Sequence, residues 1–218
     1  MKKKCFAVFA TALFFASCNN EKTSGESTVE KTDSTTTMKT EKKAWVPVDS
    51  ATAMQKYMEV ATPGEPHKIL AESDGKWTGQ ATTWMEKGGP AMTSTVKMNN
   101  KMAMDGRYQI STTTGNMAGM PFEGTATNGY DNYKKKYFSS WIDNMGTGLL
   151  VMEGTYDPAT KTLTYTGTFP NPANGAECEM KETYRMIDPN TAEMELWGTD
   201  MKTGETYKTM EIKLTKDK

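Results

Sequence analysis

The chain has 218 residues, and its 26 basic and 27 acidic side chains leave a formal net charge of −1. No basic excess is available to attract a phosphate backbone, so the composition argues against nucleic-acid binding. The chain has one histidine and three cysteines, but only Cys178 stays available once the N-terminal segment is processed as described below, so we expect no metal and no cofactor.

The first eighteen residues have the layout of a bacterial lipoprotein signal. Lys2–Lys4 are basic, residues 5–15 (CFAVFATALFF) are apolar but too few to span a bilayer, and Ala16 and Ser17 lead into Cys18. This pattern is typical of a lipobox. We therefore expect residues 1–17 to be a signal peptide that is removed, and Cys18 to be lipidated. An ordinary secretory signal cleaved near Ser17 is the alternative.

This signal predicts both the location of the protein and its attachment to a membrane. We expect the mature protein in the bacterial cell envelope, attached by its N-terminal lipid to a membrane, most simply the outer membrane of a Gram-negative cell. Removing residues 1–17 takes away three lysines and no acid, so the formal charge falls from −1 to −4. With Cys5 removed and Cys18 lipidated, Cys178 has no partner for an intramolecular disulfide.

Residues 18–44 consist mainly of Glu, Lys, Thr and Ser. Such a segment cannot bury enough apolar surface to offset its ordering entropy, so we expect a disordered tether. Residues 45–218 are then a single domain, which must be stabilised by a hydrophobic core without disulfides.

Two short helices are expected within residues 49–73, packed at one end of the domain. Asp49 and Ser50 are suitable caps for a helix that ends near Ala61, where the sequence Thr-Pro-Gly breaks it. Residues 65–67 (Glu-Pro-His) begin the second helix, and residues 74–75 (Asp-Gly) end it.

After Gly75 the side chains alternate with a period of two. Apolar residues at 163, 165 and 169, at 178, 180, 184 and 186, and at 210, 212 and 214 alternate with threonines and charged residues. Turn sequences recur between these runs, including residues 88–90, 99–100, 115–116, 130–132, 143–144, 157–158, 171–172, 188–190 and 202–204. The spacing predicts a mostly β fold of about ten antiparallel strands from Lys76 to Lys216.

A meander of this length usually closes, because closure removes exposed edges. We therefore expect an up-and-down barrel in preference to a two-sheet sandwich. The residues expected to face inward include Trp77, Phe138, Leu163, Tyr165, Met210 and Ile212.

Several motifs resemble those of a known family. Residues 75–79 (Gly-Lys-Trp-Thr-Gly) are similar to the first strand of lipocalin-like and nitrobindin-type barrels. Residues 63–70, 105–108, 121–124, 129–132, 141–148 and 154–157 resemble, in order and spacing, the domain of unknown function 1579 family of secreted bacterial proteins. The resemblance runs from about residue 60 to the C-terminus. It implies a calycin-like barrel and no established activity.

His67 is the single histidine, so a zinc site with several histidines cannot be built. It lies before the barrel, and we interpret it as a cap or hydrogen-bond partner at the barrel end. Nitrobindin-like barrels hold haem through a histidine near the end of the chain. Residues 207–218 contain none, which argues against haem binding of that kind.

A set of aromatic and polar residues is expected to line a ligand cavity: Trp84, Arg107, Tyr108, Tyr130, Trp141, Asp143 and Trp197. An arginine inside a barrel can hold a carboxylate while aromatic walls contact an apolar body. Two structural alternatives stand beside this. Arg107 or Arg185 can pack over Trp77 as a latch, and the Asp-Asn pairs at 131–132 and 143–144 are typical of turns.

The many methionines allow a copper(I) site, because thioethers are soft ligands. The alternation of most of them with polar residues favours a role as core fillers. Three classes of function follow: a binding protein for a small amphipathic or hydrophobic ligand, a packed structural or interaction module, and a barrel enzyme acting on an envelope lipid-like substrate. We expect the first, with no catalytic residue, because Cys178 shares its strand face with Met180 and no histidine stands beside a nucleophile.

Overall fold

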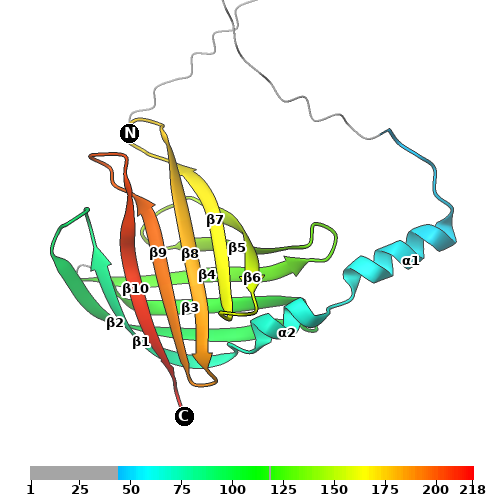
Figure 1. Cartoon of the computed structure of the whole chain (residues 1–218), viewed down its shortest axis with the longest axis horizontal. Coiled ribbons are helices and arrows are strands. Elements are labelled where there is room, and N and C mark those ends of the chain that lie inside the picture. The colour runs from blue at the N-terminus through cyan, green and yellow to red at the C-terminus, as the bar shows by residue number, and fades with distance from the viewer. Residues whose placement is uncertain (1–43, 118) are drawn as a thin grey trace, which may run out of the picture. The chain divides into compact units, whose positions relative to one another are not determined.

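Ten antiparallel strands close into one barrel, as the alternating pattern predicts (Figure 1). Each strand pairs with the next, and the first pairs with the last. The strands are β1 (Gly75–Trp84), β2 (Ala91–Ala103), β3 (Tyr108–Met117), β4 (Met120–Asp131), β5 (Lys136–Asp143), β6 (Leu150–Asp157), β7 (Thr162–Pro170), β8 (Glu177–Asp188), β9 (Thr191–Thr199) and β10 (Thr206–Lys216). The predicted calycin-like, mostly β fold is confirmed.

The computed structural model describes residues 44–117 and 119–218. The predicted signal peptide, the lipidation site Cys18 and nearly all of the predicted tether lie outside the described residues. Pro47–Lys218 forms one compact unit. Within the described residues, no helix is both long enough and apolar enough to cross a bilayer.

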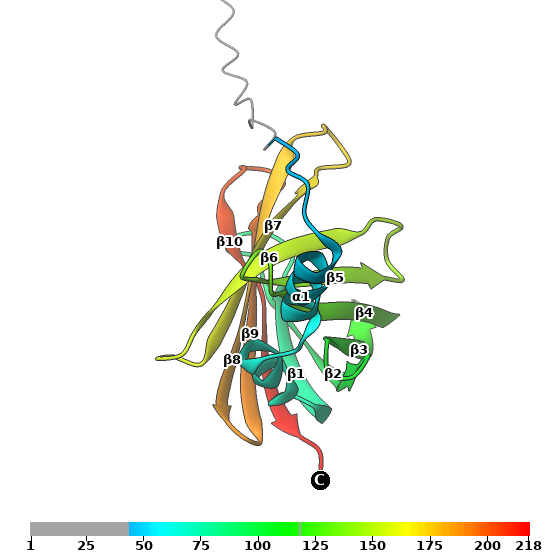
Figure 2. The ribbon, with the colours of Figure 1, turned by 90° about the vertical axis from the view of Figure 1, so that its right-hand side faces the viewer.

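Two helices precede the barrel. The helix α1 (Ser50–Ala61) is capped by Asp49, whose carboxylate accepts the backbone N–H groups of Ala51 and Thr52. The helix α2 (Glu65–Ala71) follows the break at residues 62–64. Figures 1 and 2 both place α2 at the end of the barrel where β1 begins. The expectation for α1 was wrong in one respect, because α1 buries none of its side chains.

Strand pairing defines which side chains face the interior, because paired residues point to the same side of the sheet. Trp77, fully buried, pairs with Met98 on β2 and with Lys216 on β10. Counting from Trp77 around the ring, Leu163, Tyr165, Met210 and Ile212 face inward as predicted. Phe138 faces outward, which corrects the prediction.

The reason for the Phe138 error lies in its neighbours. Tyr137 and Phe138 are adjacent aromatic residues, so one of them must face out. Tyr137 pairs with Gly154 and is buried inside, whereas Phe138 packs over Gly129 on the outer face and contacts Tyr108. Gly154, the partner of Tyr137 on β6, has no side chain to compete with the Tyr137 ring inside, and Gly129 leaves room for the Phe138 ring outside. These two glycines therefore determine which of the two aromatic residues faces inward.

The end of the barrel that carries α2 is closed by packed side chains, and we call it the closed end. Leu70 of α2 packs against Tyr137, Met152, Leu163 and Tyr165. A second cluster surrounds Trp77 and is formed by Ala81, Val96, Met98, Ala192, Ile212 and Leu214. These two clusters form the hydrophobic core that the chain requires in place of disulfides.

Polar groups also seal the closed end. Gln109 Nε2 donates to Leu70 O at 2.7 Å and to Asp74 Oδ1 at 2.9 Å, and Asn100 Nδ2 donates to Ser73 O at 3.1 Å. Asn100 therefore belongs to β2 and faces inward, although residues 99–100 were predicted as a turn. His67 Nδ1 accepts the N–H of Gly64 at 3.0 Å, which is the capping role expected for it.

The latch over Trp77 is a lysine and not an arginine. Lys216 Nζ lies 5.3 Å from the centroid of the Trp77 ring, and Trp77 Nε1 donates to Ser73 O at 2.8 Å. Arg107 instead lies in the β2–β3 turn, and Arg185 pairs with Glu193 on the outer face. A lysine at the end of β10 can reach this ring because β10 is the neighbour of β1.

Candidate functional site

The predicted site residues do not come together in one place. Tyr130, Trp141 and Asp143 face the interior, because their partners Tyr137, Ala126 and Gly124 do. Tyr108 lies outside beside Phe138, and the Arg107 guanidinium donates to Met104 O in the β2–β3 turn. Trp84 and Trp197 also lie outside. The sequence predicts that these residues line one cavity, but in the structure they lie on several separate surfaces.

The interior nevertheless holds a charged group that the sequence interpretation missed. Glu182 pairs with Tyr165 on β7 and with Leu196 on β9, and all three side chains face inward. Its strand neighbours on the same face are Met180 and Tyr184. The signal was visible in the sequence, since Glu182 stands in phase with these apolar residues and out of phase with Lys181 and Thr183.

Glu182 has an unusual environment for a carboxylate. Among residues 44–117 and 119–218, no side chain or backbone group makes a hydrogen bond or ion pair with it. Burial therefore raises the pKa of Glu182 to about 7, because an unpaired charge is unfavourable away from water. A titratable group of this kind that faces a barrel interior is a candidate for ligand recognition.

Glu182 is half-buried even though it lies deep in the barrel. The unpartnered polar atoms that are fully enclosed in the described structure are Asn100 Oδ1, Tyr184 Oη and Trp197 Nε1, and the Glu182 oxygens are not among them. Both observations are explained if the carboxylate borders an internal space that water can enter. The Glu182 carboxylate is therefore partly accessible to water and still poorly solvated.

Two unlike walls form this interior. The wall of β8–β10 carries large flexible side chains beside Glu182, namely Met180, Met194, Leu196 and Met210, all half-buried. The wall of β2–β5 carries small ones, namely Ser94, Ser111, Thr113, Ala126 and Ser139. The inner surface is therefore lined by small side chains on one side and by large flexible side chains on the other.

The end opposite α2, which carries the β1–β2, β5–β6 and β9–β10 loops, is the open end. There Trp141 stacks on Phe122, with ring centroids 6.2 Å apart and an interplanar angle of 19°. Trp141 Nε1 donates to Asp143 Oδ2 at 2.7 Å, and Asp143 Oδ1 accepts the N–H of Met145. Asp143 therefore fixes the Trp141 ring and the following turn at the rim.

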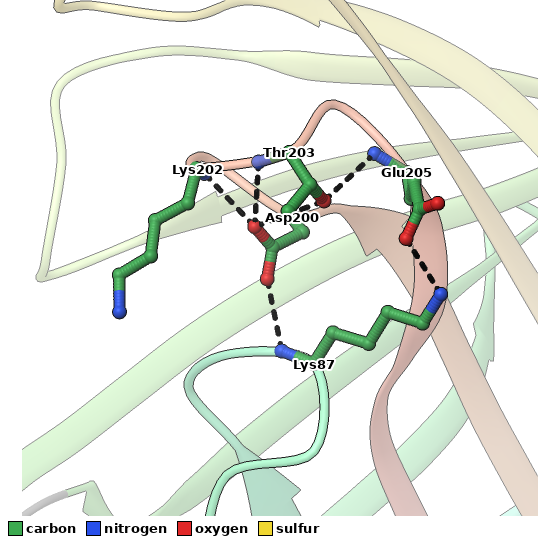
Figure 3. A network of polar contacts seen from close by, with 5 residues as sticks. All are labelled: Lys87, Asp200, Lys202, Thr203 and Glu205. Carbon is green, nitrogen blue, oxygen red and sulfur yellow. Dashed lines mark hydrogen bonds and ion pairs between the residues drawn. The ribbon is translucent and has the colours of Figure 1, made fainter.

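A polar network ties two loops of the open end together (Figure 3). Asp200 accepts the backbone N–H groups of Lys87, Lys202 and Thr203 at 2.9 Å each. These hydrogen bonds lower the pKa of Asp200 to about 2. Lys87 Nζ also pairs with Glu205 at 2.6 Å, so the β1–β2 loop is held to the β9–β10 loop.

The outer face carries a separate open groove of about 850 Å³ across β6–β9. In Figure 1, β3 and β4 run across the view, whereas β8, β9 and β10 run upright. Threonines 155, 164, 166 and 168 line the groove together with Lys181 and Trp197. Lys181 Nζ lies 4.5 Å from the Trp197 ring centroid and covers it.

The described residues offer little for a metal. No group of three or more histidine, cysteine, aspartate or glutamate side chains lies close enough to hold an ion in residues 44–117 and 119–218. Cys178 is free, buried and inward-facing, as expected for a core residue. Burial lowers the pKa of His67, which is also engaged with Gly64.

Comparison with known proteins identifies relatives by sequence family and by fold. The family model described as a protein of unknown function (DUF1579) matches residues 62–216. No curated protein matches the chain. Rv2717c from M. tuberculosis is similar in structure, with a TM-score of 0.56 and 13% identity, over 72% of this chain and 100% of that one. The S-type phycobiliprotein lyase CPES from Guillardia theta gives a TM-score of 0.53 and 8% identity, over 74% and 97%.

Proposed function

The chain belongs to the DUF1579 family, whose function is unknown, and we propose that it binds a small amphipathic ligand inside its barrel. The observation that supports this proposal is the uneven interior. The two core clusters are packed, whereas the inward residues Leu196 and Trp141 lie outside these clusters and remain half-buried. A ten-stranded barrel is wider than one that side chains just fill.

The chemistry of the interior suits a ligand with an apolar body. Methionine side chains adapt to irregular ligands, and the stacked Phe122 and Trp141 rings offer a flat apolar surface at the open end. Glu182 adds one polar contact deeper in the barrel. The S-type phycobiliprotein lyase shares this fold, but at 8% identity that likeness supports the architecture and not a shared ligand.

The test is the binding of a neutral hydrophobic dye, N-phenyl-1-naphthylamine, to the full chain lacking residues 1–17 and carrying Cys18→Ser. We expect saturable fluorescence enhancement. Ser94→Trp, which places a large ring on the inner face, should abolish it. Thr95→Trp is the matched control, because Thr95 is the exposed outward neighbour on the same strand. Equal binding by both variants would exclude the interior as the site.

Native mass spectrometry of the purified protein gives an independent test. We expect a bound small molecule that Ser94→Trp lacks and Thr95→Trp retains. A packed structural or interaction module would show neither the dye binding nor the co-purified mass.

We further propose that the protein is attached to the cell envelope by lipid on Cys18, on the strength of the basic, apolar and small-residue pattern before this cysteine. Cys18→Ser should abolish incorporation of labelled fatty acid and release the protein from the membrane fraction. Unchanged fractionation and migration of the variant would refute the lipobox interpretation.

A further inference from the structure

We propose that the ligand carries a cationic head group, an amine or a quaternary ammonium, and that Glu182 is its counter-ion inside the barrel. This inference rests on the proposed function and specifies the chemistry of the ligand. It begins from the charges that face inward.

Along the ten strands, three charged side chains occupy inward positions: Asp143, Glu182 and Lys216. Lys216 lies at the closed end over Trp77, and Asp143 lies at the rim of the open end. Between these two ends Glu182 is the one inward charge of the ten strands, and Arg107, the arginine predicted to hold a carboxylate, lies in the β2–β3 turn. An anionic head group would therefore meet negative charge and no counter-ion, whereas a cation would gain one.

The surroundings of Glu182 favour a cation as well. Tyr165 is its direct partner on β7, and Tyr184 follows it on the same face of β8. Aromatic faces attract cations, and a carboxylate beside them adds a full opposite charge. Met180, one inward position nearer the open end on β8, and Leu196, the partner of Glu182 on β9, offer contacts for an apolar tail. The head group thus points inward and the tail points to the open end.

The fold alone gives no reason for an acid at position 182. Its neighbours on the inner face are Met180, Tyr184 and Leu196, and an apolar residue there would avoid the desolvation of a carboxylate. Burial raises the pKa of Glu182 to about 7, so near neutral pH a bound cation stabilises the charged form that the empty barrel disfavours. The unpaired carboxylate is accounted for by a ligand that pairs with it.

The experiment compares three ten-carbon amphiphiles that differ only in the head group: decyltrimethylammonium, decanol and decanoate. Each displaces N-phenyl-1-naphthylamine from the full chain lacking residues 1–17 and carrying Cys18→Ser, at about pH 8. We expect decyltrimethylammonium to act at a concentration at least about tenfold lower than decanol, with decanoate the weakest.

Glu182→Gln should remove this preference, so that decyltrimethylammonium and decanol displace the dye at similar concentrations. Glu179→Gln is the matched control, because Glu179 is exposed on the outer face of the same strand. Asp143→Asn separates the contribution of the other inward carboxylate and should keep most of the preference. Circular dichroism of each variant establishes that it is folded.

A second measurement uses the protein without any substitution in the barrel. The preference for decyltrimethylammonium should grow between about pH 5.5 and about pH 8.5, as Glu182 gains its charge. The ligand has a permanent charge, and burial raises the pKa values of the neighbouring Tyr165 and Tyr184, so neither contributes a charge in this range.

The outcomes separate the two proposals. If decanol displaces the dye but the three head groups act alike, or if Glu182→Gln keeps the preference, the cationic head group is refuted and the binding function remains. If the dye does not bind, or no amphiphile displaces it, both proposals fail.

Discussion

Glu182 on β8 is the direct cross-strand partner of Tyr165 on β7, and both side chains face the barrel interior. Burial, and then the charge of Glu182, raise the pKa of Tyr165. The carboxylate and the phenol are thus held together without a hydrogen bond between them in the described structure. A carboxylate with no protein partner in this poorly solvated position costs stability unless another group pairs with it.

The first prediction concerns stability and pH. Glu182 has a folded pKa of about 7, above the value of about 4.3 for an exposed glutamate. The native state therefore binds this proton more tightly than the unfolded state does, and stability falls as pH rises from about 4 to about 7. Glu182→Gln should be more stable than the wild type by about 3–4 kcal/mol at pH 8 and nearly equal at pH 4.

Urea unfolding of the ligand-free protein at a series of pH values measures this difference. Glu179→Gln, on the outer face, should show no such trend. A pH-independent effect of Glu182→Gln would contradict the interior position of the carboxyl group.

The second prediction concerns Trp77, which is fully buried and bonded to Ser73 O. Trp77→Ala should lower the free energy of unfolding by about 3–5 kcal/mol, because it opens a cavity and leaves the Ser73 carbonyl with one partner fewer. Trp84→Ala, on the outer face of the same strand, should cost much less. Chemical denaturation followed by circular dichroism compares the two, and similar losses would argue against the central place of Trp77.

The third prediction concerns two glycines of β4, Gly124 and Gly129, against which aromatic rings pack on opposite faces of the strand. A Cβ on Gly124 would lie 2.2 Å from Trp141 Cζ2 inside, and a Cβ on Gly129 would lie 2.3 Å from Phe138 Cζ outside. Gly124→Ala and Gly129→Ala should both lower the melting temperature. Only Gly124→Ala should also change dye affinity, because it displaces a ring that faces the ligand.

The fourth prediction concerns the loop network around Asp200. Its pKa of about 2 lies below that of an exposed aspartate, so the network stabilises the fold above about pH 4 and loses this effect as pH falls to about 2. Asp200→Asn should lower the melting temperature at pH 7 and increase amide hydrogen exchange in residues 85–90 and 200–205. Exchange that rises equally throughout the barrel would indicate a global effect and not a loop effect.

The sequence was sufficient to predict the strands, because a period of two is visible wherever one face is buried and the other is wet. It was insufficient to predict the phase of every strand, that is, which of two adjacent residues faces the interior. The phase of β5 depended on Gly129 and Gly154, which lie on other strands and make room for Phe138 and Tyr137. Such a constraint is long-range and leaves no mark in the local pattern.

The same limit explains the candidate site. Trp84, Tyr108 and Trp197 are aromatic residues that a cavity can use, yet each lies one position out of phase with the inner face. Glu182 was overlooked for the opposite reason, since its charge argued for the outside while its position argued for the inside. Where residue type and periodicity disagree, periodicity located the side chain correctly.

The pairing of β1 with β10 is the seam that closes the barrel, and it affects how the chain folds. Thr78 and Asp217 are bonded at 2.8 Å although 139 residues separate them. A contact of such high sequence separation forms only after nearly the whole chain is available, so we expect ring closure to be a late and slow step of folding. Until β10 is added, β1 and β9 present unpaired edges that favour aggregation. A mutation that weakens this seam should therefore lower the yield of soluble protein more than its effect on equilibrium stability would indicate.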